Sequence, residues 1–354
     1  MAMEREHMRA IEAHREDGNE IGAQFLEGTL KTFLAAKEGG LVKDLPWEEQ
    51  VVYVSTTEPV LSPEQREEAL VHQFETRVAS LAETGITEHS FVKRYPIPTR
   101  EQFVNILRSE QNQELAERKT AQGFSRLDLT PFAAPTTHLL KKTEAIVIIA
   151  RSKANTLLLS KRDENEADHP AAVNTTDPIW IWDGIRGVLT KQGLRYFPER
   201  FTDDHGGRTR KTILTDPRIC AVPGWSIRFD EPTVILPQPH QAQTVGGRTQ
   251  LATNATPRDY LTTLSGPMYA GETGRTIEDF LTDFAVHLHE TGQVSYEWNQ
   301  QSAVWLIGNV DPQTGSVPYG FWYRGSRQLE LSAGSPGSQF GLWGTAPTVR
   351  LIGV

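Results

Sequence analysis

The order of the predicted elements favours an α+β fold. Segments with helix caps and helical apolar spacing occupy residues 1–123, and short apolar or alternating segments typical of strands follow from Ser125. Helix and strand signals then mix after Gly246. Helices first and strands later argue against a doubly wound sheet, in which the two alternate. We therefore expect a helical N-terminal region, residues 1–123, followed by a mixed domain, residues 124–354.

Three helices are predicted in the first region. Glu20–Lys37 has apolar residues at roughly helical spacing. Ser62–Gln65 and Thr99–Gln102 are both capping boxes, in which the first side chain and the fourth satisfy each other's free backbone N–H groups. The helix that begins at Ser62 is expected to end at Gly85, and the one that begins at Thr99 to fade before Gly123.

The second region contains the strand signals. The segments predicted as strands are short, apolar or alternating, and often bounded by Pro, Gly or polar residues. They are Leu127–Phe132, Glu144–Ala150, Thr156–Ser160, Pro178–Trp182, Trp225–Phe229, Thr233–Leu236, Val304–Ile307 and Thr348–Ile352. Two capped helices lie among them, one from Thr256 through Leu264 and one from Thr276 to a stop at Gly292.

Composition and charge restrict the class of protein. The 354 residues carry a net charge of −9 at pH 7, which disfavours a nucleic-acid or anionic membrane surface. No apolar run approaches the roughly 18 residues that a membrane span requires. Residues 1–20 are charged and lack the apolar core of a signal peptide, and Cys220 is the single cysteine, so no disulfide forms within the chain. We expect a cytoplasmic protein.

Residues 317–354 have an unusual composition. A Pro-aromatic segment, Val317–Tyr323, precedes small and polar residues that carry only two charges, Arg327 and Glu330, between Gly325 and Thr348. Small polar residues around rigid aromatic side chains are typical of antibody-like binding surfaces, because Tyr and Trp provide contact area at low entropic cost. The alternative is a purely structural glycine-rich hairpin that closes a β-rich core.

One cluster of residue types offers an enzymatic alternative. Asp203, Asp204 and His205 precede a glycine pair, and carboxylates with an imidazole are the ligands of a metal-dependent hydrolase. The same sequence also fits an ordinary loop. His287 and His289 lie about 200° apart on a helix, which is poor geometry for one metal. The usual nucleophile, phosphate-loop and zinc motifs are missing from the sequence.

The terminal segment resembles a known family. Trp322 is followed by Arg-Gly-Ser-Arg-Gln, then Ser-Pro-Gly-Ser, then Phe-Gly-Leu-Trp-Gly and a final Val-Arg-Leu strand. This pattern is similar to the end of the variable proteins of diversity-generating retroelements. Their C-type-lectin-like domains are of the formylglycine-generating-enzyme type, with hypervariable positions on a fixed backbone. Segments near His205, Thr244, His289 and Val317 resemble bacterial proteins with the same ending.

Two departures limit what the resemblance implies. Formylglycine-generating oxidases use a pair of cysteines, and Cys220 alone excludes that chemistry. Glu231-Pro232-Thr233 and Trp298-Asn299-Gln300 match calcium-dependent lectin motifs poorly. The resemblance therefore implies a binding scaffold without enzymatic activity, metal or cofactor, and with a protein or other macromolecule as its ligand.

The resemblance also implies which side chains bind and which support them. The expected ligand-binding residues are Phe321, Tyr323, Gly325, Ser326, Glu330, Ser332, Ser335, Ser338, Phe340, Leu342 and Trp343. The expected framework, which would hold the binding face by packing and by arginine hydrogen bonds to turn carbonyls, is Trp322, Arg324, Arg327, Gly344 and Arg350.

Overall fold

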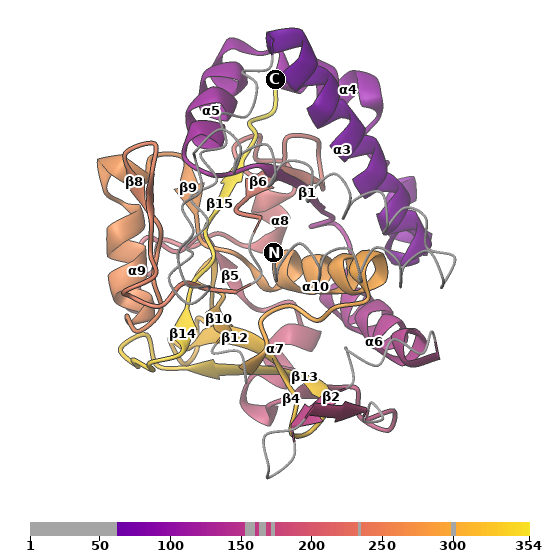
Figure 1. The fold of residues 1–354 in the computed structure, drawn as a ribbon, viewed down its shortest axis with the longest axis vertical. Helices are drawn as coiled ribbons and strands as arrows, with labels where there is room; N and C mark the ends of the chain where they lie inside the picture. Colours follow the sequence, from indigo (N-terminus) through magenta and orange to yellow (C-terminus); the bar gives the residue numbers. More distant parts are fainter. Residues whose placement is uncertain (1–61, 153–159, 163–167, 171–173, 233–234, 299–301) are drawn as a thin grey trace, which may run out of the picture. The chain divides into compact units, whose positions relative to one another are not determined.

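The computed structural model describes residues 62–152, 160–162, 168–170, 174–232, 235–298 and 302–354 (Figure 1). The chain divides into two compact units, residues 1–62 and residues 63–354, and the description below concerns the second. This unit contains helices and sheets, with helices before most of the strands, so the predicted α+β class is confirmed. The predicted helix Glu20–Lys37 lies outside the described residues.

The helices and strands of this unit are given below in chain order, with the labels used in Figure 1. The helices are α3 Pro63–Glu83, α4 Arg100–Leu107, α5 Glu110–Ala121, α6 Thr136–Ser152, α7 Asp183–Thr190, α8 Arg210–Ile213, α9 Pro257–Leu264 and α10 Ile277–Thr291, with short 3-10 turns η2 Ile86–Glu88, η3 Ser90–Lys93 and η5 Pro267–Tyr269. The strands are β1 Arg126–Thr130, β2 Ser160–Arg162, β3 Asp168–Pro170, β4 Ile179–Ile181, β5 Arg195–Tyr196, β6 Ser226–Asp230, β7 Thr244–Val245, β8 Arg248–Thr249, β9 Glu272–Thr273, β10 Ala303–Trp305, β11 Asn309–Val310, β12 Val317–Tyr323, β13 Gln328–Gly334, β14 Trp343–Gly344 and β15 Thr348–Arg350.

The capped helices form where the sequence predicts them. Thr99, Thr256 and Thr276 each close a capping box at the start of α4, α9 and α10. Gly292 ends α10 in the left-handed conformation, at φ 67°, which glycine adopts without a steric cost. The helix predicted from Thr99 ends earlier than expected, and a second helix, α5, begins after Ser109.

The helices α3–α5 share a core with the strands that follow them. Phe74 stacks on Phe103 with ring centroids 4.5 Å apart, and both rings belong to the same buried cluster as Leu127 in β1 and Phe284 in α10. Helix α3 contacts β1 directly. The predicted boundary at Gly123 therefore does not separate two cores, because these helices cover strands of the second region.

Two sheets flank helix α10. The first sheet has the strand order β1-β6-β15-β9 and is antiparallel throughout. The second has the order β14-β10-β12-β13-β4, with β12 and β13 paired antiparallel as a long hairpin. Helix α10 contacts β1 of the first sheet and β12 of the second. The terminal segment, residues 317–354, therefore begins in the second sheet and ends in the first, on either side of this helix.

Buried ion pairs connect the first sheet to α10. Arg350 in β15 binds Asp279 at 2.5 Å, and Arg228 in β6 binds Asp279 at 3.2 Å. Arg228 also binds Asp283, which Arg275 reaches at 2.5 Å. These side chains are nearly inaccessible to solvent. Burial alone would raise the pKa of Asp279, but Arg350 and Arg228 outweigh that effect and hold it well below its ordinary value.

One predicted strand is wrong and two others lie partly or wholly outside the described residues. Glu144–Ala150 belongs to helix α6, in which Ile146 and Val147 are buried while Ile148 is exposed. Residues 156–159 and 233–234 are outside the description. Ser160 begins β2, whereas Ile235 and Leu236, the described half of the predicted strand Thr233–Leu236, do not form a strand. The strands predicted at Leu127–Phe132, Pro178–Trp182, Trp225–Phe229, Val304–Ile307 and Thr348–Ile352 are present as β1, β4, β6, β10 and β15.

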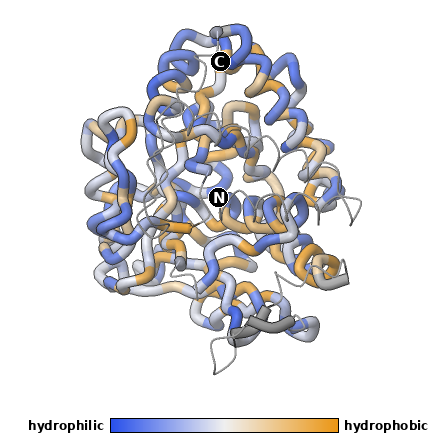
Figure 2. Tube along the Cα trace, viewed as in Figure 1, coloured by the Kyte–Doolittle hydropathy of each residue, from blue (hydrophilic) through white to orange (hydrophobic). Residues whose placement is uncertain are grey.

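The apolar stretch of α6 stands out from the mostly hydrophilic colours of α5 in Figure 2. Even so, none of the described helices is long and apolar enough to cross a membrane.

Candidate ligand-binding site

The hairpin β12–β13 presents alternate side chains to opposite sides of the second sheet. Tyr319, Phe321 and Tyr323 share one side, and Gly320 and Trp322 share the other. The strand pairing extends this division across the sheet. We call the first side the outer face, which consists of Trp180, Ala303, Trp305, Tyr319, Phe321, Tyr323, Gln328, Glu330, Ser332 and Trp343.

The opposite side packs on helix α10. Trp322 stacks on Phe284 with centroids 6.2 Å apart. A Cβ atom on Gly320 would lie 2.5 Å from a ring atom of Phe280, so only glycine leaves room for this ring. Leu329 and Leu331 of β13 are fully buried on the same side. The inner side of the hairpin is therefore fixed by packing.

Aromatic rings form a continuous cluster on the outer face. Trp343 is at its centre, with ring centroids 4.2 Å from Tyr319, 4.3 Å from Phe340 and 4.9 Å from Trp305. Phe321 connects the cluster to the hairpin end, 5.1 Å from Trp298 and 6.3 Å from Tyr323. Solvent exposure increases across the cluster. Trp305 is fully buried, whereas Tyr323 and Phe340 are 37% and 45% exposed.

Polar groups lie beside these rings. Glu330 is directly opposite Phe321 on one neighbouring strand and Trp180 on the other. Its carboxylate accepts a hydrogen bond of 3.0 Å from Ser326 Oγ. Burial raises the pKa of Glu330 above its ordinary value, and the Ser326 hydrogen bond offsets only part of that rise. The Trp343 indole N–H is buried and has no acceptor among the described residues.

The segment between β13 and β14 extends the site beyond the sheet. Gln339 Nε2 donates to the Asn254 carbonyl at 2.7 Å, which ties this segment to the loop before α9. Phe340 covers Trp343, and Ser335 Oγ accepts from the Gly337 N–H. The segment thus has fixed ends and exposed small residues between them.

The structure brings the predicted binding residues together on the outer face and its adjoining loops, but their exposure differs. Tyr323, Gly325, Ser335 and Phe340 are exposed, and Ser326, Glu330, Ser338 and Leu342 are half-buried. Three predicted contacts, Phe321, Ser332 and Trp343, are buried in the free protein, because neighbouring rings cover them. These three therefore support the exposed residues more than they contact solvent.

Four of the predicted framework residues are fixed by packing or by ion pairs, and the arginine contacts that the structure shows are not the predicted ones. Trp322 and Arg350 are buried, and Arg324 binds the buried Glu297. Arg324 and Arg350 bind the carboxylates of Glu297 and Asp279, and Arg350 also donates to Ser226 Oγ. A Cβ atom on Gly344 would lie 3.1 Å from Leu236.

Arg327 departs from the framework prediction. Its side chain is exposed, and its backbone has φ 61° in the turn between β12 and β13. Its carbonyl accepts a hydrogen bond from Asn174 N at 3.1 Å. Arg327 therefore contributes to the hairpin through its backbone conformation in the turn. Its exposed side chain does not support a buried carbonyl.

Trp180, Trp298 and Tyr319 belong to the site and were missing from the predicted set. Trp180 is 36% exposed on the outer face. The alternation of Pro178–Trp182 predicts its exposure, and the same alternation along β12 places Tyr319 with Phe321 and Tyr323. The position of Trp298 depends on contacts remote in sequence, which no local pattern indicates.

The residues of the hydrolase alternative do not converge. Asp204 binds Arg200 at 2.5 Å, and His205 Nδ1 accepts from the Gly207 N–H. Among the described residues the structure brings one set of three potential ligands close enough for a metal, Asp128, Asp230 and Asp283. Arginines already neutralise that set, including Arg77 on Asp128 and Arg275 on Asp230 and Asp283.

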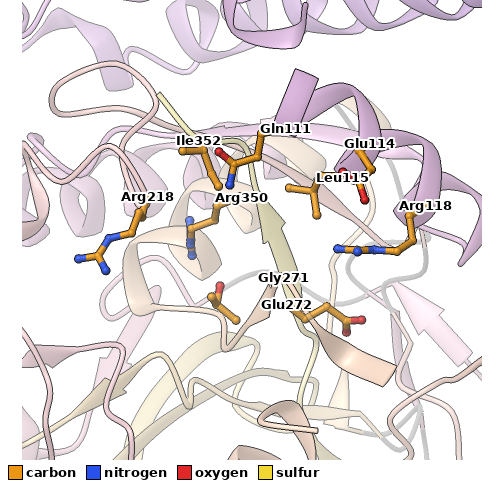
Figure 3. A pocket seen from close by; sticks show the side chains of 10 residues that line it. Gln111, Glu114, Leu115, Arg118, Arg218, Gly271, Glu272, Arg350 and Ile352 are labelled. Carbon is orange, nitrogen blue, oxygen red and sulfur yellow. The ribbon is translucent and has the colours of Figure 1, made fainter. Parts of the chain in front are cut away.

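A separate pocket of about 410 Å³ lies between α5 and the ends of β9 and β15. Figure 3 shows Arg218 and Arg118 on opposite sides of it, with Arg350 between them. Its charges are largely satisfied within the protein, since Glu272 binds Lys119 and Arg218 binds Asp216. The pocket therefore offers a ligand fewer groups that are not already engaged within the protein than the outer face does.

Comparison with known proteins gives no relative for this chain: no protein-family model, curated protein or solved structure matches it.

Proposed function

We propose that this protein is a display scaffold that binds a protein or other macromolecular ligand through the outer face and its adjoining loops. The surface consists of exposed Tyr323 and Phe340, half-buried Ser326 and Glu330, and the small residues of 335–338. Buried rings beneath them keep the exposed rings in place, which lowers the entropy lost on binding.

The observation that carries this proposal is the alternation along the hairpin. Outward side chains of β12 and β13 alternate with inward ones, and inward Trp322 packs on Phe284 of α10. Because adjacent residues point to opposite faces, the exposed outward positions can change without altering the inward packing. A diversified surface on a constant core requires this property.

The composition of the face fits a protein ligand. Protein interfaces are enriched in Tyr, Trp and Phe at the centre, with polar groups around them. A few residues, often Trp, Tyr or Arg, give most of the binding energy at such sites. The outer face has this arrangement, with serines and Glu330 beside the rings.

Denaturation of two variants tests the proposal. In the first, Tyr323, Ser326, Glu330, Ser335, Ser338, Phe340 and Leu342 are replaced together by Ala, Asn or Ser. Changes at surface positions usually alter stability by about 0.5 kcal/mol or less each, so the average loss per substitution should stay below that value. In the second, Trp322→Ala removes a buried ring and should cost about 3–5 kcal/mol from one position. An average loss per substitution in the first variant that approaches the loss in Trp322→Ala would mean that the hairpin is purely structural.

Diversification is a separate part of the proposal and has a genomic test. A near-copy of the coding sequence for the terminal segment, beside a reverse-transcriptase gene and differing from it at adenines, would support it. The expected changes fall in codons for outward residues and spare those for Trp322, Gly344 and Arg350.

A further inference from the structure

Glu330 has no basic partner among the residues that the structure describes. Its cross-strand neighbours are Phe321 and Trp180, and within this part of the chain its carboxylate accepts one hydrogen bond, from the neutral Ser326. The nearest charged residues along the chain face elsewhere, since Arg324 binds Glu297 and Arg327 lies in the exposed turn. No lysine or arginine among the described residues forms an ion pair with Glu330.

Other buried carboxylates of the protein are treated differently. Asp279 has Arg350 and Arg228, and Glu272 has Lys119 and Arg248. A charge removed from water without a partner is unfavourable, so proteins normally pair it. The half-buried Glu330 beside aromatic rings is therefore a group to which a ligand could supply the opposite charge.

We propose that the ligand presents an arginine side chain that binds Glu330 and stacks on Trp180. This inference rests on the proposed function and specifies the chemistry of the partner: a protein surface with an exposed arginine. The net charge of −9 favours a basic partner as well.

Arginine fits this position better than lysine. A planar guanidinium can donate two parallel hydrogen bonds to one carboxylate and at the same time lie flat on an indole ring. Trp180 is exposed beside Glu330 and can provide that ring. The hydroxyl of Ser326, at hydrogen-bond distance from the carboxylate, can accept a further guanidinium N–H.

The raised pKa of Glu330 agrees with this geometry. Burial disfavours the ionised form in the free protein, and a bound guanidinium would favour it. Replacing Glu330 with Gln should therefore leave the fold intact, since it removes a charge that no described lysine or arginine pairs with.

A titration of the full chain tests the inference. The probes are N-acetyl-arginine amide and N-acetyl-citrulline amide, which has nearly the same shape without the charge. Backbone amide resonances of Glu330 and its strand neighbours report binding. We expect arginine amide to bind in the millimolar range and about tenfold or more tighter than citrulline amide, the difference expected for a charge-assisted hydrogen bond. Lysine amide should bind more weakly than arginine amide.

Two variants and one control locate the effect. Glu330→Gln should reduce the preference for arginine over citrulline to less than about twofold, and Trp180→Leu should weaken arginine binding severalfold while keeping some preference. Glu114→Gln, which removes the same charge from exposed α5, should behave as the native chain.

The outcomes are distinct. The inference would be overturned if arginine amide and citrulline amide bound the native chain equally well. It would also be overturned if the preference for arginine amide over citrulline amide persisted in Glu330→Gln. Should Glu330→Gln fail to fold, the Trp180→Leu titration decides, and unchanged arginine binding there refutes the proposal. None of these results affects the denaturation contrast, so the display function can stand when the arginine proposal fails.

Discussion

Arg350 offers a sharp test of how the first sheet is held to α10. Its guanidinium binds Asp279 Oδ2 at 2.5 Å and Ser226 Oγ at 2.7 Å, and its side chain is 2% exposed. The variant Arg350→Met keeps much of the side-chain volume and removes the charge. Asp279 then loses one of its two arginines and keeps Arg228 at 3.2 Å.

The expected loss follows from these contacts. Removing one partner of a buried ion pair typically costs about 3–5 kcal/mol, because the other charge stays buried. Arg228, Thr130 and Thr276 still bind Asp279, so the lower end of that range, about 3 kcal/mol, applies here. Typical domains have only about 5–15 kcal/mol of stability, so the variant should lose a large part of its margin.

Urea denaturation followed by tryptophan fluorescence measures this loss. Arg218→Met is the matched control, since Arg218 lines the same pocket but is 66% exposed, and its pair with Asp216 should contribute about 0–1 kcal/mol. The double variant with Asp279→Asn should lose less than the sum of the two single variants. A loss below about 1 kcal/mol for Arg350→Met would refute the importance of this ion pair.

The pH dependence of stability in acid gives a second measurement of the ion pair between Arg350 and Asp279. The pKa of Asp279 is depressed in the folded protein, so its contribution is present above its unfolded pKa of about 3.9 and is lost as the pH falls toward the folded value. In Arg350→Met the folded pKa rises toward the unfolded one, so stability should depend less on pH below about 4.

Three further predictions concern packing, the thiol and metals. Gly320→Ala would place a methyl group 2.5 Å from Phe280 and should cost about 1–3 kcal/mol in urea denaturation, whereas Gly341→Ala, with no atom within 4 Å of its new Cβ, should be nearly neutral. Burial raises the pKa of Cys220 to about 12, so a thiol reagent at pH 8 should modify it only as fast as the protein opens; rapid native-state labelling would contradict this. A chelator should leave the thermal melt unchanged, because arginines already neutralise Asp128, Asp230 and Asp283; a drop of several degrees would indicate a bound metal.

Local signals in the sequence were sufficient for part of the fold. Capping boxes at Thr99, Thr256 and Thr276 fix helix starts through bonds within four residues, so their prediction needs no tertiary information. The alternation within Val317–Tyr323 likewise determines which rings share a face once the segment is a strand.

Other features depend on contacts between distant residues. Glu144–Ala150 is apolar enough for either a buried strand or a buried helix, and packing of α6 against α10 decides for the helix. The partners of Asp279 are Arg228 and Arg350, which lie far from it in the chain. The parallel pairing of β4 with β13, which brings Trp180 beside Glu330, is equally invisible to local patterns.

The place of β15 has a consequence for which genetic changes in the hairpin can survive. This strand follows β12, β13 and β14 in the chain, yet it pairs with both β6 and β9 in the first sheet. A substitution in codons 317–342 leaves β15 untouched, whereas a one-nucleotide insertion or deletion there rewrites Val349 and Arg350 and removes the strand between two others. Under the proposed diversification, folding would act as a check on the reading frame, because only genes in which translation has stayed in register would yield stable protein.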